Sequence, residues 1–153
     1  MAVSRRTVLK GILATGGIAL GTTVLPTAVM ADWPKQAFEA NTVDDVIKAL
    51  FESQDVEESS KIHIETPKIA ENGAVVPIEI MTDFSKVESI TIIGDKNPVP
   101  LIGQFNFFDN AEGYVKTRVK LGETSNVVVV VKSEGKLYIA RRAVKVTLGG
   151  CGG

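Results

Sequence analysis

Asn126-Val-Val-Val-Val-Val-Lys132 is the stretch that decides the fold. Its five consecutive valines are β-branched, which favours extended backbone. Because side chains alternate between the two faces of a strand, the run is apolar on both faces. Such a strand lies in the middle of a sheet that is covered on both sides. The sequence therefore predicts a buried, central β-strand with further β-structure around it.

Shorter strands are predicted on both sides of this run. In the segment 114–121, apolar residues alternate with Lys116, Arg118 and Lys120, which is typical of a strand with one wet face. We interpret these cations as a solvated sheet face, with anion binding as the alternative. Pro77 lies inside its strand and has no N–H to donate, so that strand is predicted to be an edge strand or bulged. The other predicted strands, separated by turn residues, are 61–65, 75–81, 87–93, 99–102, 104–108 and 136–148.

The last of these strands changes the parity of its apolar residues. Leu137 and Ile139 share one parity, whereas Val144 and Val146 share the other. A strand keeps each parity on one face, and an extra residue is needed to turn its apolar set over. The sequence therefore predicts a β-bulge near Arg141-Arg142.

One short helix is predicted before the strands. Thr42 is a suitable N-cap, and Asp45 stands where a capping box needs an acceptor. From Val43 to Phe51 the apolar residues recur at helical spacing and form one stripe. The predicted fold class is therefore all-β: an antiparallel, immunoglobulin-like β-sandwich preceded by one short N-terminal helix.

Composition excludes several classes of function. The chain has 153 residues and a formal net charge of -1, whereas a nucleic-acid-binding protein needs an excess of Lys and Arg. A single Cys excludes an internal disulfide, and one Cys with one His excludes the usual structural zinc sites. His63, between two isoleucines, is predicted to be an ordinary strand histidine rather than a ligand. We find no motif for a metal or a cofactor.

Residues 1–31 have the pattern of an export signal. Arg5 and Arg6 are adjacent in a positive segment, and residues 11–25 are weakly apolar and uncharged. That stretch is too short to span a membrane, and the arginine pair is typical of the twin-arginine pathway. Cleavage is predicted after Ala31. The mature protein is then expected in the periplasm, detached from the membrane.

The chain ends in Gly149-Gly150-Cys151-Gly152-Gly153, which holds its only cysteine. Glycine loses more conformational entropy on ordering than any other residue, so a flexible arm is predicted. A thiol on such an arm can enter a narrow active site, because neither neighbour of Cys151 has a Cβ atom. The alternative is an unreactive thiol at a frayed terminus.

The chain is not predicted to be an enzyme. A nucleophilic cysteine needs a base within hydrogen-bond distance, and a flexible tail does not hold Cys151 at a fixed position against His63. The predicted division is therefore a signal at 1–31, a helix plus β-sandwich at 32–148 and a carrier arm at 149–153.

The signal, the sandwich-like domain and the terminal Gly-Gly-Cys-Gly-Gly together resemble the SoxY family of the bacterial Sox thiosulfate-oxidation system. The segment Pro67-Lys-Ile-Ala-Glu-Asn-Gly-Ala-Val-Val-Pro77 also resembles the first core strands of that family. The resemblance covers essentially the whole chain, and its most specific part is the terminal pentapeptide. Val8, where the twin-arginine motif usually has Phe, departs from the pattern and concerns export alone.

The resemblance implies a covalent carrier without a cofactor. In the family, a haem c enzyme joins the cysteine equivalent to Cys151 oxidatively to thiosulfate. A dimanganese hydrolase then releases sulfate, and a sulfane dehydrogenase oxidises the remaining sulfur, which stays bound to the cysteine. The carrier forms a heterodimer with a smaller β-sandwich subunit, SoxZ, which would explain folded export without a cofactor. The valine run is a further, weaker sign of a surface that a partner covers.

Two other classes stay open at this point. One is an exported, immunoglobulin-like binding module with no covalent sulfur chemistry. The other is a ubiquitin-like sulfur carrier that uses the C-terminal carboxyl of Gly153. That chemistry needs ATP and therefore the cytoplasm, so the export signal argues against it.

Overall fold

The computed structural model describes residues 34–53, 55–109 and 111–147. The predicted export signal with Arg5 and Arg6, the cleavage position after Ala31 and the arm at residues 149–153 lie outside these ranges. The predictions made for them therefore stay predictions.

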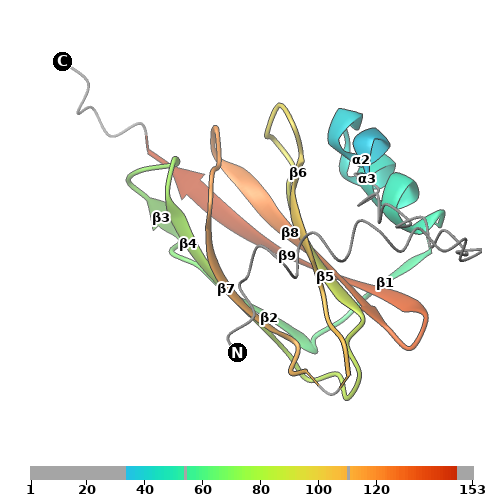
Figure 1. Ribbon diagram of the computed structural model, residues 1–153. Coiled ribbons are helices and arrows are strands. Elements are labelled where there is room, and N and C mark those ends of the chain that lie inside the picture. The colour runs from blue at the N-terminus through green and yellow to red at the C-terminus, as the bar shows by residue number, and fades with distance from the viewer. Residues whose placement is uncertain (1–33, 54, 110, 148–153) are drawn as a thin grey trace, which may run out of the picture. The chain divides into compact units, whose positions relative to one another are not determined.

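The described residues form two β-sheets and two short helices, arranged in layers (Figure 1). The helices lie against the face of the larger sheet that points away from the smaller sheet. The layer order is therefore helices, larger sheet, smaller sheet.

The helices are α2 (Lys35–Glu39) and α3 (Val43–Phe51). The larger sheet has the order β1 (Val56–Glu58), β9 (Lys136–Val146), β8 (Ser125–Ser133), β5 (Ser89–Gly94) and β6 (Leu101–Asn106), and β3 (Ile69–Ala70) also pairs with β9. The smaller sheet has the order β2 (Ile62–Glu65), β4 (Val76–Thr82) and β7 (Tyr114–Val119).

The valine run forms the centre of the larger sheet. β8 pairs with β5 along one edge and with β9 along the other. Val127, Val129 and Val131 are buried between the two sheets, whereas Val128 and Val130 are buried beneath the helices. The prediction of a central strand covered on both faces is confirmed, and each parity of the run fills a different core.

The helix α3 begins at the predicted cap. The Thr42 side chain accepts a hydrogen bond from the Asp45 backbone N–H at 3.2 Å, and its hydroxyl donates to the Asp45 carboxylate at 2.6 Å. Val46 and Ile47 are buried against the larger sheet. None of the described helices is long and apolar enough to cross a membrane.

The prediction of a single helix is wrong, because α2 precedes α3. With only five residues it is too short for its apolar positions to show a period. Ala37 of α2 is buried in the core beneath the helices. Tertiary packing therefore stabilises this short helix, and its sequence alone does not predict it.

The mostly-β, sandwich-like arrangement is confirmed, but it is not wholly antiparallel. β1 pairs with β9 in parallel, with Val56 opposite Leu137, and β3 pairs with β9 in parallel, with Ala70 opposite Val146. These two strands have three and two residues, which is too few for an alternating pattern to show. Their direction depends on the path of the chain around β9.

The predicted bulge in β9 is also wrong. The pairing of β8 with β9 keeps one register from Ser125 opposite Val144 to Ser133 opposite Lys136. Leu137 and Ile139 pack beneath the helices, whereas Val144 packs between the sheets. Because two different layers cover the two faces of β9, its apolar parity changes without an extra residue. A register shift occurs instead between β5 and β6, at Ile92/Ile93, and β6 runs through Gly103 as one strand.

Pro77 was predicted to lie on an edge or bulged strand, yet β4 is the middle strand of the smaller sheet. The register explains why proline is tolerated there. β2 ends opposite Glu79, so at Pro77 the strand pairs only with β7, opposite Arg118. Pro77 therefore occupies a local edge of a strand that is otherwise central.

Candidate functional site

The described structure ends at Thr147, four residues before Cys151. We call residues 145–147 the arm root, because the predicted carrier arm continues from them. One edge of the root is held by β3. The Lys145 N–H donates to the Lys68 carbonyl at 2.9 Å, and the Thr147 N–H donates to the Ala70 carbonyl at 3.0 Å. Figure 1 shows β3 beside the end of β9.

Thr124 holds the opposite edge of the arm root. The backbone ladder between β8 and β9 ends with Ser125 opposite Val144, so Val146 has no strand residue opposite it on that side. Instead, the Thr124 hydroxyl accepts the Val146 N–H at 3.0 Å and donates to the Val146 carbonyl at 3.3 Å. One side-chain hydroxyl therefore contacts both polar groups that a further ladder residue would pair.

The turn between β3 and β4 packs against the root from a third side. The Gly73 carbonyl accepts the Leu121 N–H at 2.7 Å. A Cβ atom on Gly73 would collide with the Leu121 carbonyl oxygen and would lie 2.8 Å from a methyl of Val146. Glycine is needed here because of this close backbone approach.

A groove with several cationic side chains runs beside the arm root. Arg141 is paired with Glu58 at 2.7 Å, between Nη1 and Oε1. Lys68, Arg142 and Lys145 give the groove a positive potential, which favours the binding of anions near the arm root. The groove is lined by Lys68, Thr124, Arg141, Arg142, Ala143, Val144 and Lys145.

The remaining candidate residues lie outside β9, on β2 and on β7 with the residue that follows it. His63 lies on the exposed side of β2, and its Nε2 is 2.8 Å from the Asp83 carboxylate, as expected of a partnered surface histidine. Lys116 and Arg118 on β7 and Lys120 just after it are all exposed, in agreement with a solvated face. In the described ranges, no group of three or more His, Cys, Asp or Glu side chains could hold a metal ion.

Lys116 belongs to a small polar network. Its Nζ donates to Glu79 at 2.8 Å, and the Tyr114 hydroxyl donates to the other Glu79 oxygen at 2.8 Å. The hydrogen bonds from Lys116 and, secondly, Tyr114 lower the pKa of Glu79 below its ordinary value. The same contact with Glu79 raises the pKa of Lys116 and of Tyr114. The charge of Lys116 is therefore compensated within the chain.

The sequence did not reveal the arm root. Asn72-Gly73 has the signal of a turn, but nothing local shows that the turn packs against Val146. Thr124 is an ordinary loop threonine by sequence, and β3 is too short to be predicted. The residues that the sequence did single out for sulfur chemistry, Cys151 and its four glycines, lie beyond the described ranges.

Comparison with known proteins identifies the class to which this fold and chain end belong. A family model described as "Sulfur oxidation protein SoxY" matches residues 47–151. A solved structure described as the sulfur carrier protein SoxY from Chlorobium limicola f thiosulfatophilum is 40% identical, with a TM-score of 0.65. The match covers 70% of this chain and 97% of that one. The chain is thus one of the sulfur oxidation proteins, and it belongs to the SoxY family.

Another solved structure is much more distant. It is described as a study of T cell specificity and activation by the bacterial superantigen toxic shock syndrome toxin-1. Its chain is 10% identical, with a TM-score of 0.40, and the match covers 56% of this chain and 99% of that one. Similarity at this level carries no functional information. No curated protein matches the chain.

Proposed function

We propose that this protein is a periplasmic sulfur carrier that holds thiosulfate-derived sulfur covalently on Cys151 and presents it to the enzymes of thiosulfate oxidation. One observation carries the proposal. The chain belongs to the SoxY family, whose model matches through residue 151, and a relative with 40% identity is described as a sulfur carrier. The protein is therefore a substrate of other enzymes and does not itself catalyse the chemistry.

The proposed loading step is a two-electron oxidation. The Cys151 thiol and thiosulfate form an S–S bond, giving a cysteine S-thiosulfonate, with release of one proton and transfer of two electrons to a haem c enzyme. Water then cleaves the terminal S–SO₃ bond, which releases sulfate and two protons and leaves a persulfide anion on Cys151. Bonds of this kind are exchangeable by thiolate attack, so one cysteine can be loaded and unloaded repeatedly.

The anchored arm root supports delivery by an arm. Since β3 and Thr124 hold Val146 and Thr147, the sandwich is a fixed base for whatever follows. Cys151 is the fourth residue after Thr147, and four residues of fully extended chain span at most about 14 Å. The thiol can therefore be carried that far from the sandwich into a partner's active site.

We also propose export by the twin-arginine pathway, because Arg5 and Arg6 form the pair that its receptor reads. Replacing both with lysine is expected to leave unprocessed precursor in the cytoplasm. Normal periplasmic delivery of that double variant, measured by fractionation and immunoblotting, would show that another route is used.

The carrier role is tested by separating the thiol from its glycine neighbours. Cys151→Ser should abolish thiosulfate-dependent turnover in a reconstituted system without changing the fold. Gly150→Val with Gly152→Val keeps the thiol but adds branched side chains on both sides of it. This variant should react with a small thiol reagent at the wild-type rate, yet it should be loaded much more slowly by the haem c enzyme.

Three results would count against the proposal. Unchanged turnover in Cys151→Ser would exclude covalent attachment at this thiol and favour an exported binding module. Equal losses of the glycine variant in both assays would show that the glycines adjust thiol reactivity and do not give access. Undiminished enzymatic loading of that variant would exclude an arm that must enter a narrow channel.

A further inference from the structure

We propose that Thr124 is a positioning residue that fixes where the carrier arm begins. The proposal rests on the function assigned to Cys151 above. Its physical basis lies entirely in the described residues, at the point where β9 runs beyond its partner strand β8.

At that point the two edges of β9 are held in different ways. On the β3 edge, the backbone amides of Lys145 and Thr147 donate to carbonyls at 2.9 and 3.0 Å. On the β8 edge, the ladder has already ended, and the one hydroxyl of Thr124 bonds both the N–H and the carbonyl of Val146. Without that hydroxyl, β3 alone would bond the backbone of the last two residues of the root, while the Val146 side chain would still pack against Gly73 and the core between the sheets.

A two-residue strand is a weak holder by itself. β3 has only Ile69 and Ala70, and although Ala70 is buried opposite Val146, Ile69 opposite Lys145 is 57% exposed, so the pairing of β3 with β9 is short and partly at the surface. Loss of the Thr124 contacts would therefore favour opening of the arm root from Thr147 back toward Lys145, and the proposed arm would then begin two or three residues earlier in the chain. The local concentration of a tethered group falls roughly as the −3/2 power of tether length, so delivery to a partner should slow about two- to threefold.

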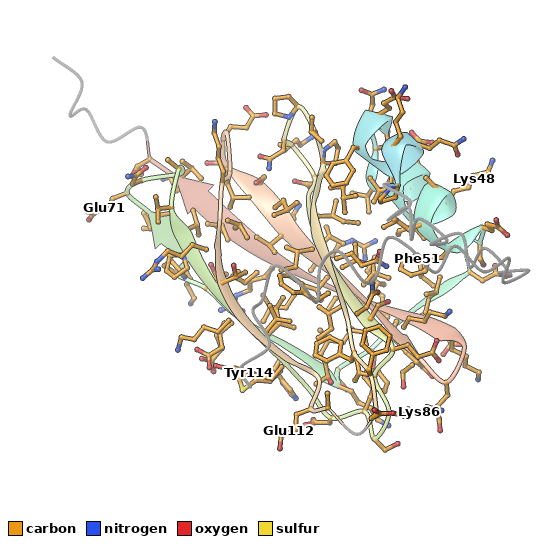
Figure 2. The ribbon with its side chains drawn as sticks, viewed as in Figure 1. Lys48, Phe51, Glu71, Lys86, Glu112 and Tyr114 are labelled. Carbon is orange, nitrogen blue, oxygen red and sulfur yellow. The ribbon has the colours of Figure 1, made fainter. Side chains whose placement is uncertain are left out.

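Thr124→Val and Thr124→Ser test the hydroxyl directly. Valine keeps the shape of threonine and removes the hydroxyl, whereas serine restores it. Ser133→Ala is a matched control, because the Ser133 hydroxyl also donates to a backbone carbonyl, that of Lys86 at 2.6 Å, at the other end of β8. Figure 2 shows Lys86 at the end of the sandwich opposite Glu71, which lies near the arm root.

Two measurements are made on the full mature chain. Amide hydrogen exchange of Val146, followed by NMR, should be about fivefold faster in Thr124→Val, as loss of one typical hydrogen bond predicts. Loading of Cys151 by the haem c enzyme should slow two- to threefold, while reaction with a small thiol reagent stays unchanged. Thr124→Ser should restore both values, and Ser133→Ala should leave both at wild type even if its melting temperature falls.

An unchanged Val146 exchange rate or an unchanged loading rate in Thr124→Val would overturn the proposal, as would the same changes in Ser133→Ala. If Thr124→Val fails to fold, Thr124→Ala replaces it, since Thr124 is exposed and a smaller side chain meets no clash there. Failure of the carrier function would be recognised by a different result, namely normal thiosulfate-dependent turnover of Cys151→Ser. In that case the exchange rate of the Val146 amide would still show whether Thr124 anchors the arm root.

Discussion

At the residue scale, the arm root depends on a backbone approach that only glycine allows. A methyl group on Gly73 would meet the Leu121 carbonyl, which belongs to the backbone and cannot turn aside. We predict that Gly73→Ala lowers the free energy of unfolding by about 1–3 kcal/mol, as overpacking usually does. Urea denaturation measures this difference.

Gly122→Ala is the control for this prediction. It lies in the neighbouring loop, and its nearest contacts to a new Cβ are 3.8 and 4.0 Å, which is ordinary van der Waals distance. It should therefore be close to neutral. If both alanine variants were equally stable, the close approach at Gly73 would have no energetic importance.

A pH effect is expected from Glu79 at the same scale. Lys116 and Tyr114 lower its pKa in the folded state relative to the ordinary value of 4.5. A carboxylate of this kind stabilises the fold above its unfolded pKa, and the contribution is lost as the pH falls through the lowered, folded pKa. We therefore predict that Glu79→Gln flattens the loss of stability on acidification below about pH 5.

Urea denaturation of wild type and variant at several pH values checks the Glu79 prediction. Tyr114→Phe should show a smaller effect, because Lys116 is the larger cause of the shift. Parallel stability curves for wild type and Glu79→Gln would contradict the assignment. Glu88, whose pKa is lowered by the Gly135 N–H and by Lys132, should retain part of the acid dependence in every variant.

At the element scale, α3 depends on its cap. The Thr42 side chain accepts the Asp45 N–H, and the helix brings Val46 and Ile47 onto the larger sheet. Thr42→Ala should lower the free energy of unfolding by about 1 kcal/mol, whereas Thr42→Ser should keep most of it. Thermal unfolding of the three proteins tests this, and an alanine variant as stable as wild type would show that packing alone holds α3.

The same scale shows which elements a sequence can predict. The valine run and the cap of α3 are local signals, and both elements occur where they were predicted. The absence of a bulge in β9 could not be predicted from the sequence. Such a prediction requires knowing that the helices cover Leu137 and Ile139 while the smaller sheet covers Val144. β1 and β3 are too short to leave a pattern. In the site, Cys151 was chosen from sequence, but the contacts of Thr124 and Gly73 with Val146 exist only through the tertiary fold.

At the scale of the whole molecule, we expect a stable complex with a SoxZ-like β-sandwich subunit. The valines of β8 give this no support, because they are buried within the chain itself. The edge strand β6 gives some support for such a complex, because among the described strands it pairs only with β5. Phe105 on this strand is 38% exposed, and Phe108 just beyond it is 79% exposed. Co-expressed and co-purified protein should elute as a heterodimer, and elution as a free monomer at micromolar concentration would contradict this.

The central claim is that sulfur is carried on Cys151, and intact-mass and peptide mass spectrometry of protein isolated from cells grown on thiosulfate tests it most directly. The account predicts sulfur-containing adducts on the peptide that holds Cys151, removable by a thiol reductant because the link is an S–S bond. Adducts confined to the Gly153 carboxyl, or a Cys151 peptide that carries no sulfur under turnover, would contradict it.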